Sequence, residues 1–176
     1  MAGILKVDKY QDFNGNDIMT SDGSGNLTLN NAAMKNTPAF AAYLGSNQSI
    51  SNATATKMNY DTEVYDTDSA FNTSTYTFTI PSGGAGKYFF FANLTVAGAV
   101  AGDKHIIYLY KNNSLDAFIS RSVGRGDDDS IQLSAFVDAS VSDYFDIRYY
   151  HNFGTTKTVE AGVTRTVFGA YKLIGA

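Results

Sequence analysis

The dominant pattern along this chain is an alternation of apolar and polar side chains. It is clearest in residues 86–96, where one face would carry Tyr88, Phe90, Ala92, Leu94 and Val96 and the other Phe89, Phe91, Asn93 and Thr95. Successive side chains of a strand point to opposite faces, so this period of two predicts a β-strand. An exposed apolar patch usually marks an interface. We expect self-association through Phe89 and Phe91, the alternative being that a long loop of the same chain covers them.

The same two-sided pattern recurs later in the chain. In residues 131–137 it turns Ile131, Leu133, Ala135 and Val137 inward and Phe136 outward, and in 144–149 it aligns Phe145, Ile147 and Tyr149. Strand signals separated by Gly, Asn and Asp continue from Pro38 onward, which is typical of a sandwich or barrel. No helix of useful length is expected, because residues 32–34 are too few and 40–43 are followed by Gly45.

The first 35 residues form a distinct segment. Short apolar stretches at 4–7 and 27–29 flank polar, glycine-containing runs at 14–17 and 22–26. This pattern predicts short strands joined by turns. Because an isolated hairpin is marginal in water, the segment is expected to attach to its own copies or to another protein. The predicted organisation is an attachment segment at 1–35 and one globular domain at 36–176.

Composition narrows the classes of protein. The 176 residues include 14% aromatic and 17% charged side chains, which is typical of a folded β protein. A net charge of -4 with 13 scattered Lys and Arg residues argues against nucleic acid as a partner. Cysteine is absent, which excludes disulfides and thiolate metal sites. Lys6 follows only a few apolar residues, so we expect neither a secretion signal nor a membrane span, and synthesis in the cytoplasm.

Catalytic chemistry has few candidates here. The only histidines are His105, inside the predicted strand 104–110, and His151. Neither has a Ser or Asp at a motif spacing that would indicate a catalytic triad, and His105 is interpreted as a packed or edge residue. We therefore expect a protein that is not an enzyme and needs no cofactor.

Acidic residues offer a possible calcium site, and one tripeptide resembles an adhesion motif. Asp61, Asp66, Asp68 and the run 127–129 carry the hard oxygen ligands that calcium prefers, but no loop has its ligand spacing, so a solvated acidic turn is the favoured interpretation and no metal site is assigned. Arg125-Gly126-Asp127 matches an integrin-binding tripeptide and is interpreted as a turn.

Four landmarks in the last three quarters of the chain occur in a familiar order. They are Phe40-Ala41-Ala42-Tyr43; Tyr76-Thr77-Phe78-Thr79-Ile80-Pro81 leading to Gly86-Lys87-Tyr88-Phe89-Phe90; Ser142-Asp143-Tyr144-Phe145-Asp146-Ile147; and Phe168-Gly169-Ala170-Tyr171-Lys172-Leu173-Ile174. In this order they resemble the globular head of complement component one, subcomponent q, and the related tumour-necrosis-factor jelly rolls. The resemblance implies an all-β jelly-roll sandwich.

The resemblance also implies an assembly. Such heads are typically threefold trimers packed through the inner sheet, and the matching positions here are Phe89, Phe91, Gln132 and Phe136. The chain departs from the family pattern at Ser142, where a glycine is usual, and in the lengthened turn at 82–86. No collagen-like stem precedes the head, so a role in animal immunity is not expected.

The first thirty residues resemble a different group, the short leaders of tail-fibre and other virion proteins of marine phages. The stretches that carry this resemblance are Ile4-Leu5-Lys6-Val7-Asp8 and Gly23-Ser24-Gly25-Asn26-Leu27-Thr28-Leu29. It implies a virion protein held through residues 1–30 by another virion protein.

Two functions follow as expectations. The first is a receptor-binding tip of a phage fibre or spike that recognises a host-surface glycan or protein; the second is a capsid decoration or cement protein. An adhesin would use exposed loops, with 98–103, 111–116 and 124–129 as candidates at its distal end, because loops on a rigid sandwich carry binding function. No individual ligand-binding residue is assigned.

Overall fold

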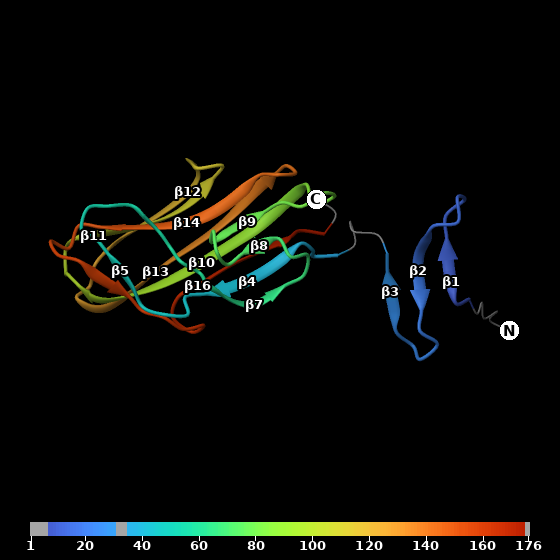
Figure 1. Ribbon diagram of the computed structural model, residues 1–176, viewed down its shortest axis with the longest axis horizontal. Coiled ribbons are helices and arrows are strands. Elements are labelled where there is room, and N and C mark those ends of the chain that lie inside the picture. Colours follow the sequence, from blue (N-terminus) through green and yellow to red (C-terminus); the bar gives the residue numbers. More distant parts are fainter. Residues whose placement is uncertain (1–6, 31–34, 175–176) are drawn as a thin grey trace.

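The computed structural model describes residues 7–30 and 35–174, except for the side chains of 116–118. Every regular element in this part of the chain is a strand (Figure 1), and no helix there is long and apolar enough to cross a membrane. The strands are β1 (Lys9–Gln11), β2 (Asp17–Ser21), β3 (Leu27–Leu29), β4 (Ala39–Tyr43), β5 (Gln48–Ile50), β6 (Thr56–Lys57), β7 (Thr62–Asp66), β8 (Phe71–Asn72), β9 (Thr77–Thr79), β10 (Gly86–Ala99), β11 (Lys104–Lys111), β12 (Ser114–Val123), β13 (Asp127–Ala139), β14 (Tyr144–His151), β15 (Lys157–Val159) and β16 (Val167–Lys172).

Strands β1, β2 and β3 form a small antiparallel sheet of their own, which we call the leader sheet. None of its strand residues is buried, and Tyr10 and Leu27 are more than half exposed. Strand β3 lies where the sequence predicted it, whereas the prediction at 4–7 falls almost wholly outside the described residues. The leader sheet thus lacks a core of its own, as expected for a segment that needs a partner.

Two turns of the leader share one hydrogen-bond arrangement. The carboxylates of Asp12 and Asp22 each accept bonds from backbone N–H groups two and four residues further along the chain. Each also accepts from the side-chain amide of Asn16 or Asn26, at 2.8 and 2.6 Å. These amides are the largest cause of the lowered pKa of both carboxyls. The two Asx-type turns set the lengths of the connections between the three strands.

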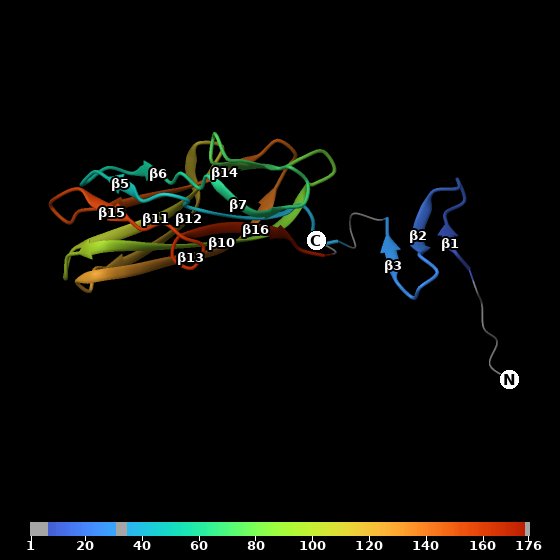
Figure 2. The same ribbon diagram turned by 60° about the horizontal axis from the view of Figure 1, so that its bottom comes forward.

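The globular domain that follows the leader, which we call the head, contains two sheets. The larger sheet is built around β10, the longest strand. Along one edge β10 pairs with β13 over almost its whole length. Along the other edge its first half pairs with β16 and its end pairs with β15, and the sheet continues through β4 and β7 on one branch and β5 on the other. Figure 2 shows β13, β10 and β16 side by side as one layer of the sandwich.

The smaller sheet forms the second layer. Its order is β12, β11, β14, β9, β8, with β6 pairing with the later part of β14. All pairings in both sheets are antiparallel, as a jelly roll requires. The strands predicted at 86–96, 104–110, 131–137 and 144–149 are confirmed, and the landmark at 40–43 lies in β4.

Aromatic rings dominate the core between the layers. Phe40 stacks on Phe71 and Phe78, with ring centroids 4.7 and 4.5 Å apart, and meets Phe168 edge-on at 5.0 Å. All four side chains are 5% exposed or less. Each such ring pair adds about 0.5–1.5 kcal/mol beyond the burial of area. Rings from β4, β8, β9 and β16 therefore hold the two sheets together at this point.

Gly169 on β16 marks a close approach between strands. A Cβ atom at this position would lie 2.7 Å from Cε1 of Phe91 and 2.8 Å from the carbonyl oxygen of Phe40. Real Cβ contacts are not so short, so any side chain here would force a ring and a backbone group to move. The glycine therefore leaves room for the Phe91 ring against β16.

Substitution of this glycine should destabilise the head. For Gly169→Ala we expect the free energy of unfolding to fall by about 1–3 kcal/mol, the usual cost of overpacking. Denaturant unfolding at one fixed protein concentration measures it. The control Ser49→Ala, at an exposed position of β5, should change it by less than about 0.5 kcal/mol. An unchanged free energy in Gly169→Ala would contradict the close packing of Phe91.

Candidate functional site

The outer face of the larger sheet carries a cluster of aromatic rings, which we call the aromatic face. Strand pairing places Phe89 of β10 between Phe136 of β13 and Tyr171 of β16. The ring centroids of Phe89 lie 5.1 Å from Phe136 and 5.5 Å from Tyr171. Phe136 is 66% exposed. Both of these ring contacts of Phe89 are made by strand residues and not by a covering loop.

The remaining two predicted interface residues lie on the same face. Phe91 covers Gly169, and Gln132 of β13 stands opposite Asn93 of β10. Phe91 and Gln132 line one open hollow of about 300 Å³. The structure therefore brings Phe89, Phe91, Gln132 and Phe136 onto one surface, and their role in a trimer stays a prediction.

The character of the aromatic face changes along the strands. Phe89 lies near the start of β10, and beyond Asn93 the face becomes polar, with the Thr95 and Ser130 hydroxyls 3.0 Å apart. Near the start of β10, Lys87 accepts a backbone bond from Leu173, and Pro38 accepts one from Lys172. The rings thus lie toward the end of the sandwich where both chain ends of the head emerge, which we call the leader end.

Only two of the three candidate loops lie together at the opposite, distal end. Gly102 donates to the carbonyl of Gly124 at 3.0 Å, and Gly124 donates to that of Asp103 at 2.7 Å, so loops 98–103 and 124–129 are in contact. The turn after β11 lies at the leader end, where Asn112 donates to Tyr144 at 2.9 Å. Placing 111–116 at the distal end was wrong, because β11 runs the length of the sandwich between that turn and loop 98–103.

A buried polar cluster lies beneath the distal loops. His105 and His151 face each other on β11 and β14 and are both fully buried. His105 Nδ1 lies 3.1 Å from the Tyr149 hydroxyl, and its Nε2 lies 3.6 Å from a carboxylate oxygen of Asp129 and has no hydrogen-bond partner. The same carboxylate accepts the backbone N–H of Arg125. The cluster ties loop 124–129 to the smaller sheet.

This cluster corrects one interpretation of the acidic run. Asp127 and Asp128 are exposed, but Asp129 is 5% exposed and points inward toward His105, so only part of the run is a solvated turn. The inward turn follows from alternation along β13, where Asp129 shares its face with Ile131. Among residues 7–30 and 35–174, no three His, Asp or Glu side chains are grouped to hold a metal ion.

Protonation of the two histidines should weaken the fold. Burial is the largest cause of the lowered pKa of both His105 and His151; the Asp129 charge acts in the opposite direction on the first. The unfolded chain therefore binds protons near pH 6.5 more readily than the folded one. Stability is then greatest above about pH 6.5 and falls as the pH drops through the lower folded-state values.

Unfolding measured between pH 7.5 and pH 5 tests this, each buried histidine contributing at most about 1.4 kcal/mol per pH unit. The variant His105→Gln should show a shallower loss over this range than the unsubstituted chain. A matched substitution at an exposed polar residue, Gln11→Ala in the leader sheet, should leave the slope unchanged. An identical slope in His105→Gln would contradict a folded state that excludes the His105 proton.

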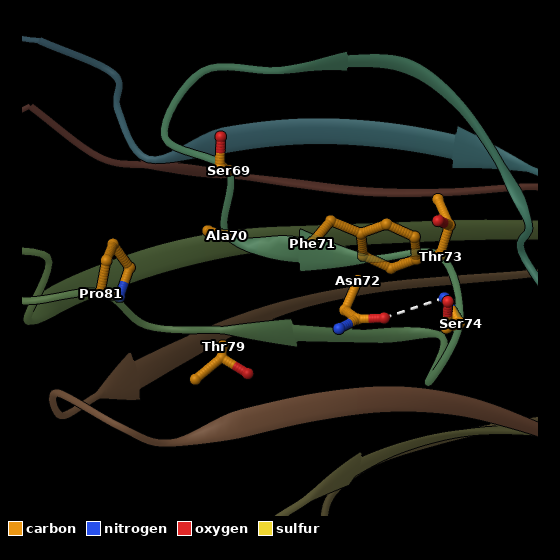
Figure 3. A pocket seen from close by; sticks show the side chains of 8 residues that line it. All are labelled: Ser69, Ala70, Phe71, Asn72, Thr73, Ser74, Thr79 and Pro81. Carbon is orange, nitrogen blue, oxygen red and sulfur yellow. Dashed lines mark hydrogen bonds between the residues drawn. The ribbon is translucent and has the colours of Figure 1, made fainter.

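An open hollow of the described surface lies beside the β8–β9 hairpin (Figure 3). It has a volume of about 560 Å³ and is lined by Ser69, Ala70, Phe71, Asn72, Thr73, Ser74, Thr79 and Pro81. The Asn72 side-chain oxygen accepts the N–H groups of Ser74 and Thr75 at 2.9 and 3.0 Å, so it shapes the turn. The lining offers hydroxyl and amide groups. Because it contains no titratable side chain, it does not provide a general acid or base.

Comparisons with known proteins bear on the fold. No family model and no curated protein matches the sequence. The structure is similar to the globular domain of zebrafish complement 1qA, with a TM-score of 0.58, 14% identity, and 78% of this chain covering 98% of that one.

Two tumour-necrosis-factor-type structures are similar as well. The Eiger TNF of S. frugiperda has a TM-score of 0.53 at 13% identity, with 79% of this chain covering 95% of that one. Murine APRIL has a TM-score of 0.53 at 11% identity, with 77% covering 99%. The predicted all-β jelly roll of the complement-q and tumour-necrosis-factor type is thereby confirmed. The likeness at these identities is one of fold.

Proposed function

We propose that this chain is a non-enzymatic, trimeric phage virion protein, the tip of a fibre or spike, that binds a host-surface receptor such as a glycan. The observation that carries the proposal is the aromatic face, a group of partly exposed aromatic rings on the outer side of the larger sheet. It is joined by a leader sheet that has no core of its own. Both features need protein partners to cover their apolar side chains, and neither forms a catalytic centre.

The aromatic face favours threefold self-association. Phe136 at 66% exposure and the half-buried Phe89 and Phe91 give a contiguous apolar surface, which soluble monomers rarely expose. Jelly rolls of this type are typically homotrimers, and a closed ring of three copies buries such a face without leaving an open end. A trimer therefore explains why the outward positions of β10 and β13 carry phenylalanine.

The leader sheet suits anchoring. Val7, Tyr10 and Leu27 are exposed and, with Met19, line an almost wholly apolar hollow of about 230 Å³. Phe13 is fully exposed in the first turn. Covering these side chains requires another protein or the leaders of neighbouring copies. The resemblance to leaders of phage virion proteins makes a virion protein our proposed partner.

The distal loops suit recognition. Loops 98–103 and 124–129 lie at the end of the head opposite the chain ends, so a head anchored through its leader presents them outward. Three copies place three such sites on one tip, which raises the avidity of a weak site without new contacts. The second candidate, a capsid cement protein, shares the leader and the aromatic face but does not need these loops.

Charge placed in the aromatic face should dissociate the trimer. We expect Phe89→Asp and Phe136→Asp to lower the mass from three chains to one, or to make the protein precipitate, because a buried unpaired carboxylate is costly. Sedimentation velocity measures the mass. The control Val123→Asp, at a 58% exposed position of the smaller sheet, should stay trimeric. A trimer retained in both phenylalanine variants would place the interface elsewhere.

Loop substitutions separate the adhesin from the cement protein. A fluorescent trimer applied to a panel of bacterial strains should bind some of them saturably, and the combined variant V100S/A101S/R125S/D128S should lose about tenfold or more in apparent affinity, since three sites weaken together. The matched variant S140A/V141S changes exposed residues at the leader end and should bind as the unsubstituted chain does. A trimer that binds no strain but decorates phage capsids would support the cement protein instead.

A further inference from the structure

We infer that the outer face of the smaller sheet is a binding site for an acidic oligosaccharide. The site consists of Tyr108, Tyr110 and Tyr150 with the cations Lys104 and Arg121. The inference rests on the proposed receptor-binding function and assigns it a surface and a ligand class. We call this surface the tyrosine face.

Alternation along three paired strands builds the tyrosine face. On β11 the outward positions are Lys104, Ile106, Tyr108 and Tyr110, while His105, Ile107 and Leu109 face the core. Strand pairing sets Tyr150 of β14 opposite Ile106, and Arg121 of β12 opposite Ile106 on the other side. Strand β11 begins at Lys104, directly after loop 98–103, so the face reaches the distal end of the head.

Two of the three rings pack against each other. Tyr108 and Tyr110 meet edge to face with centroids 6.1 Å apart, and the Arg148 guanidinium lies 3.9 Å above the Tyr110 ring. The Lys104 ammonium lies 5.7 Å from the Tyr150 ring centroid. Ile106 points outward yet is only 5% exposed, so the longer side chains around it cover it. The rings themselves stay partly exposed.

The Tyr108 hydroxyl remains a protonated donor. Burial is the largest cause of the raised pKa of Tyr108; Tyr110 and Tyr150 add to it, and Arg121 acts in the opposite direction. The face thus combines flat apolar rings, O–H donors and a cation.

The charge on this face is opposite to that of the whole chain. The Asp146 carboxylate is 1% exposed and is neutralised by Lys57 at 3.3 Å and by Arg148 at 2.9 Å. Lys104 and Arg121 are exposed and, among the described residues, form no ion pair with a carboxylate. An anion would therefore meet two unpaired cations here on a chain whose net charge is -4.

These features together select an acidic sugar. The C–H faces of pyranose rings pack on exposed aromatic rings, tyrosine hydroxyls pair with sugar hydroxyls, and a guanidinium matches the geometry of a carboxylate or sulfate group. A nucleic-acid site would need more cations along a phosphate track than the two found here. The face belongs to the layer opposite the aromatic face, so trimerisation through the aromatic face leaves it open to solvent.

The test measures binding of defined polymers to the intact trimer by biolayer interferometry. Oligogalacturonate and dextran sulfate supply the carboxylate and sulfate arms; methyl-esterified oligogalacturonate and dextran are their neutral counterparts, and oligothymidylate represents nucleic acid. We expect binding to at least one acidic sugar, roughly tenfold or more weaker binding to its neutral counterpart, and weakening by salt.

Two variants locate the site. Tyr108→Ser removes a ring, and K104S/R121S removes only exposed charges and should leave trimer mass and melting unchanged. Each is expected to weaken binding about tenfold. The control Lys35→Ser removes one exposed lysine from outside the head's strands and should bind normally.

Several outcomes would overturn the inference. They are equal binding to acidic and neutral sugars, unchanged binding in K104S/R121S, and tighter binding to oligothymidylate than to either acidic sugar. If the trimer binds bacterial cells and K104S/R121S binds them equally well, the tyrosine face is not the receptor site while the proposed function stands. If the trimer binds acidic sugars through this face but no cells, the site is real and the proposed receptor-binding function falls.

Discussion

The organisation of the head depends on covering both faces of one strand. The inward side chains of β10, from Tyr88 to Val96, fill the core between the two sheets and are almost completely buried. Its outward side chains include Phe89 and Phe91, which stay partly exposed although rings from β13 and β16 contact Phe89. A single copy of the chain buries the inward side chains of β10 but leaves its outward side chains partly exposed. Self-association is the physical consequence that we draw from this strand.

The same asymmetry divides the surface into regions with different chemistry. The larger sheet presents apolar rings toward its leader end, while the smaller sheet presents tyrosines and cations along β11 and its neighbouring strands. The first surface suits a dry interface between like copies, and the second suits a hydrated, anionic ligand. Because they lie on opposite layers, assembly and recognition need not compete for one surface.

The sequence predicted β10, β11, β13 and β14 because each combines a period of two with aromatic or branched side chains, but it did not predict β12. It did not reveal β5, β6 or β15, which have two or three residues each and exist through pairing with longer strands. It also placed loop 111–116 at the wrong end, since a single chain order does not say which loops meet. The inward turn of Asp129 was present in the alternation along β13, but the acidic run concealed it.

The sequence indicated residues of the aromatic face but did not indicate the tyrosine face. Phe89 and Phe91 stand out because both faces of one segment are apolar, which is visible in a single stretch of letters. Tyr108, Tyr150 and Arg121 come from three different strands, and only the register between those strands brings them together. The matching turns at Asp12 and Asp22 were visible as a ten-residue spacing, although their shared hydrogen bonds needed coordinates.

The most direct test of the central claim, that the aromatic face is buried against other copies, uses the absence of tryptophan from this chain. In Phe136→Trp the single indole reports on a position that is 66% exposed in one copy. The account predicts a blue-shifted emission that iodide barely quenches, in a solution whose scattering mass is three times the 19.0 kDa chain. A red-shifted, freely quenched emission from a species of one chain mass would contradict it.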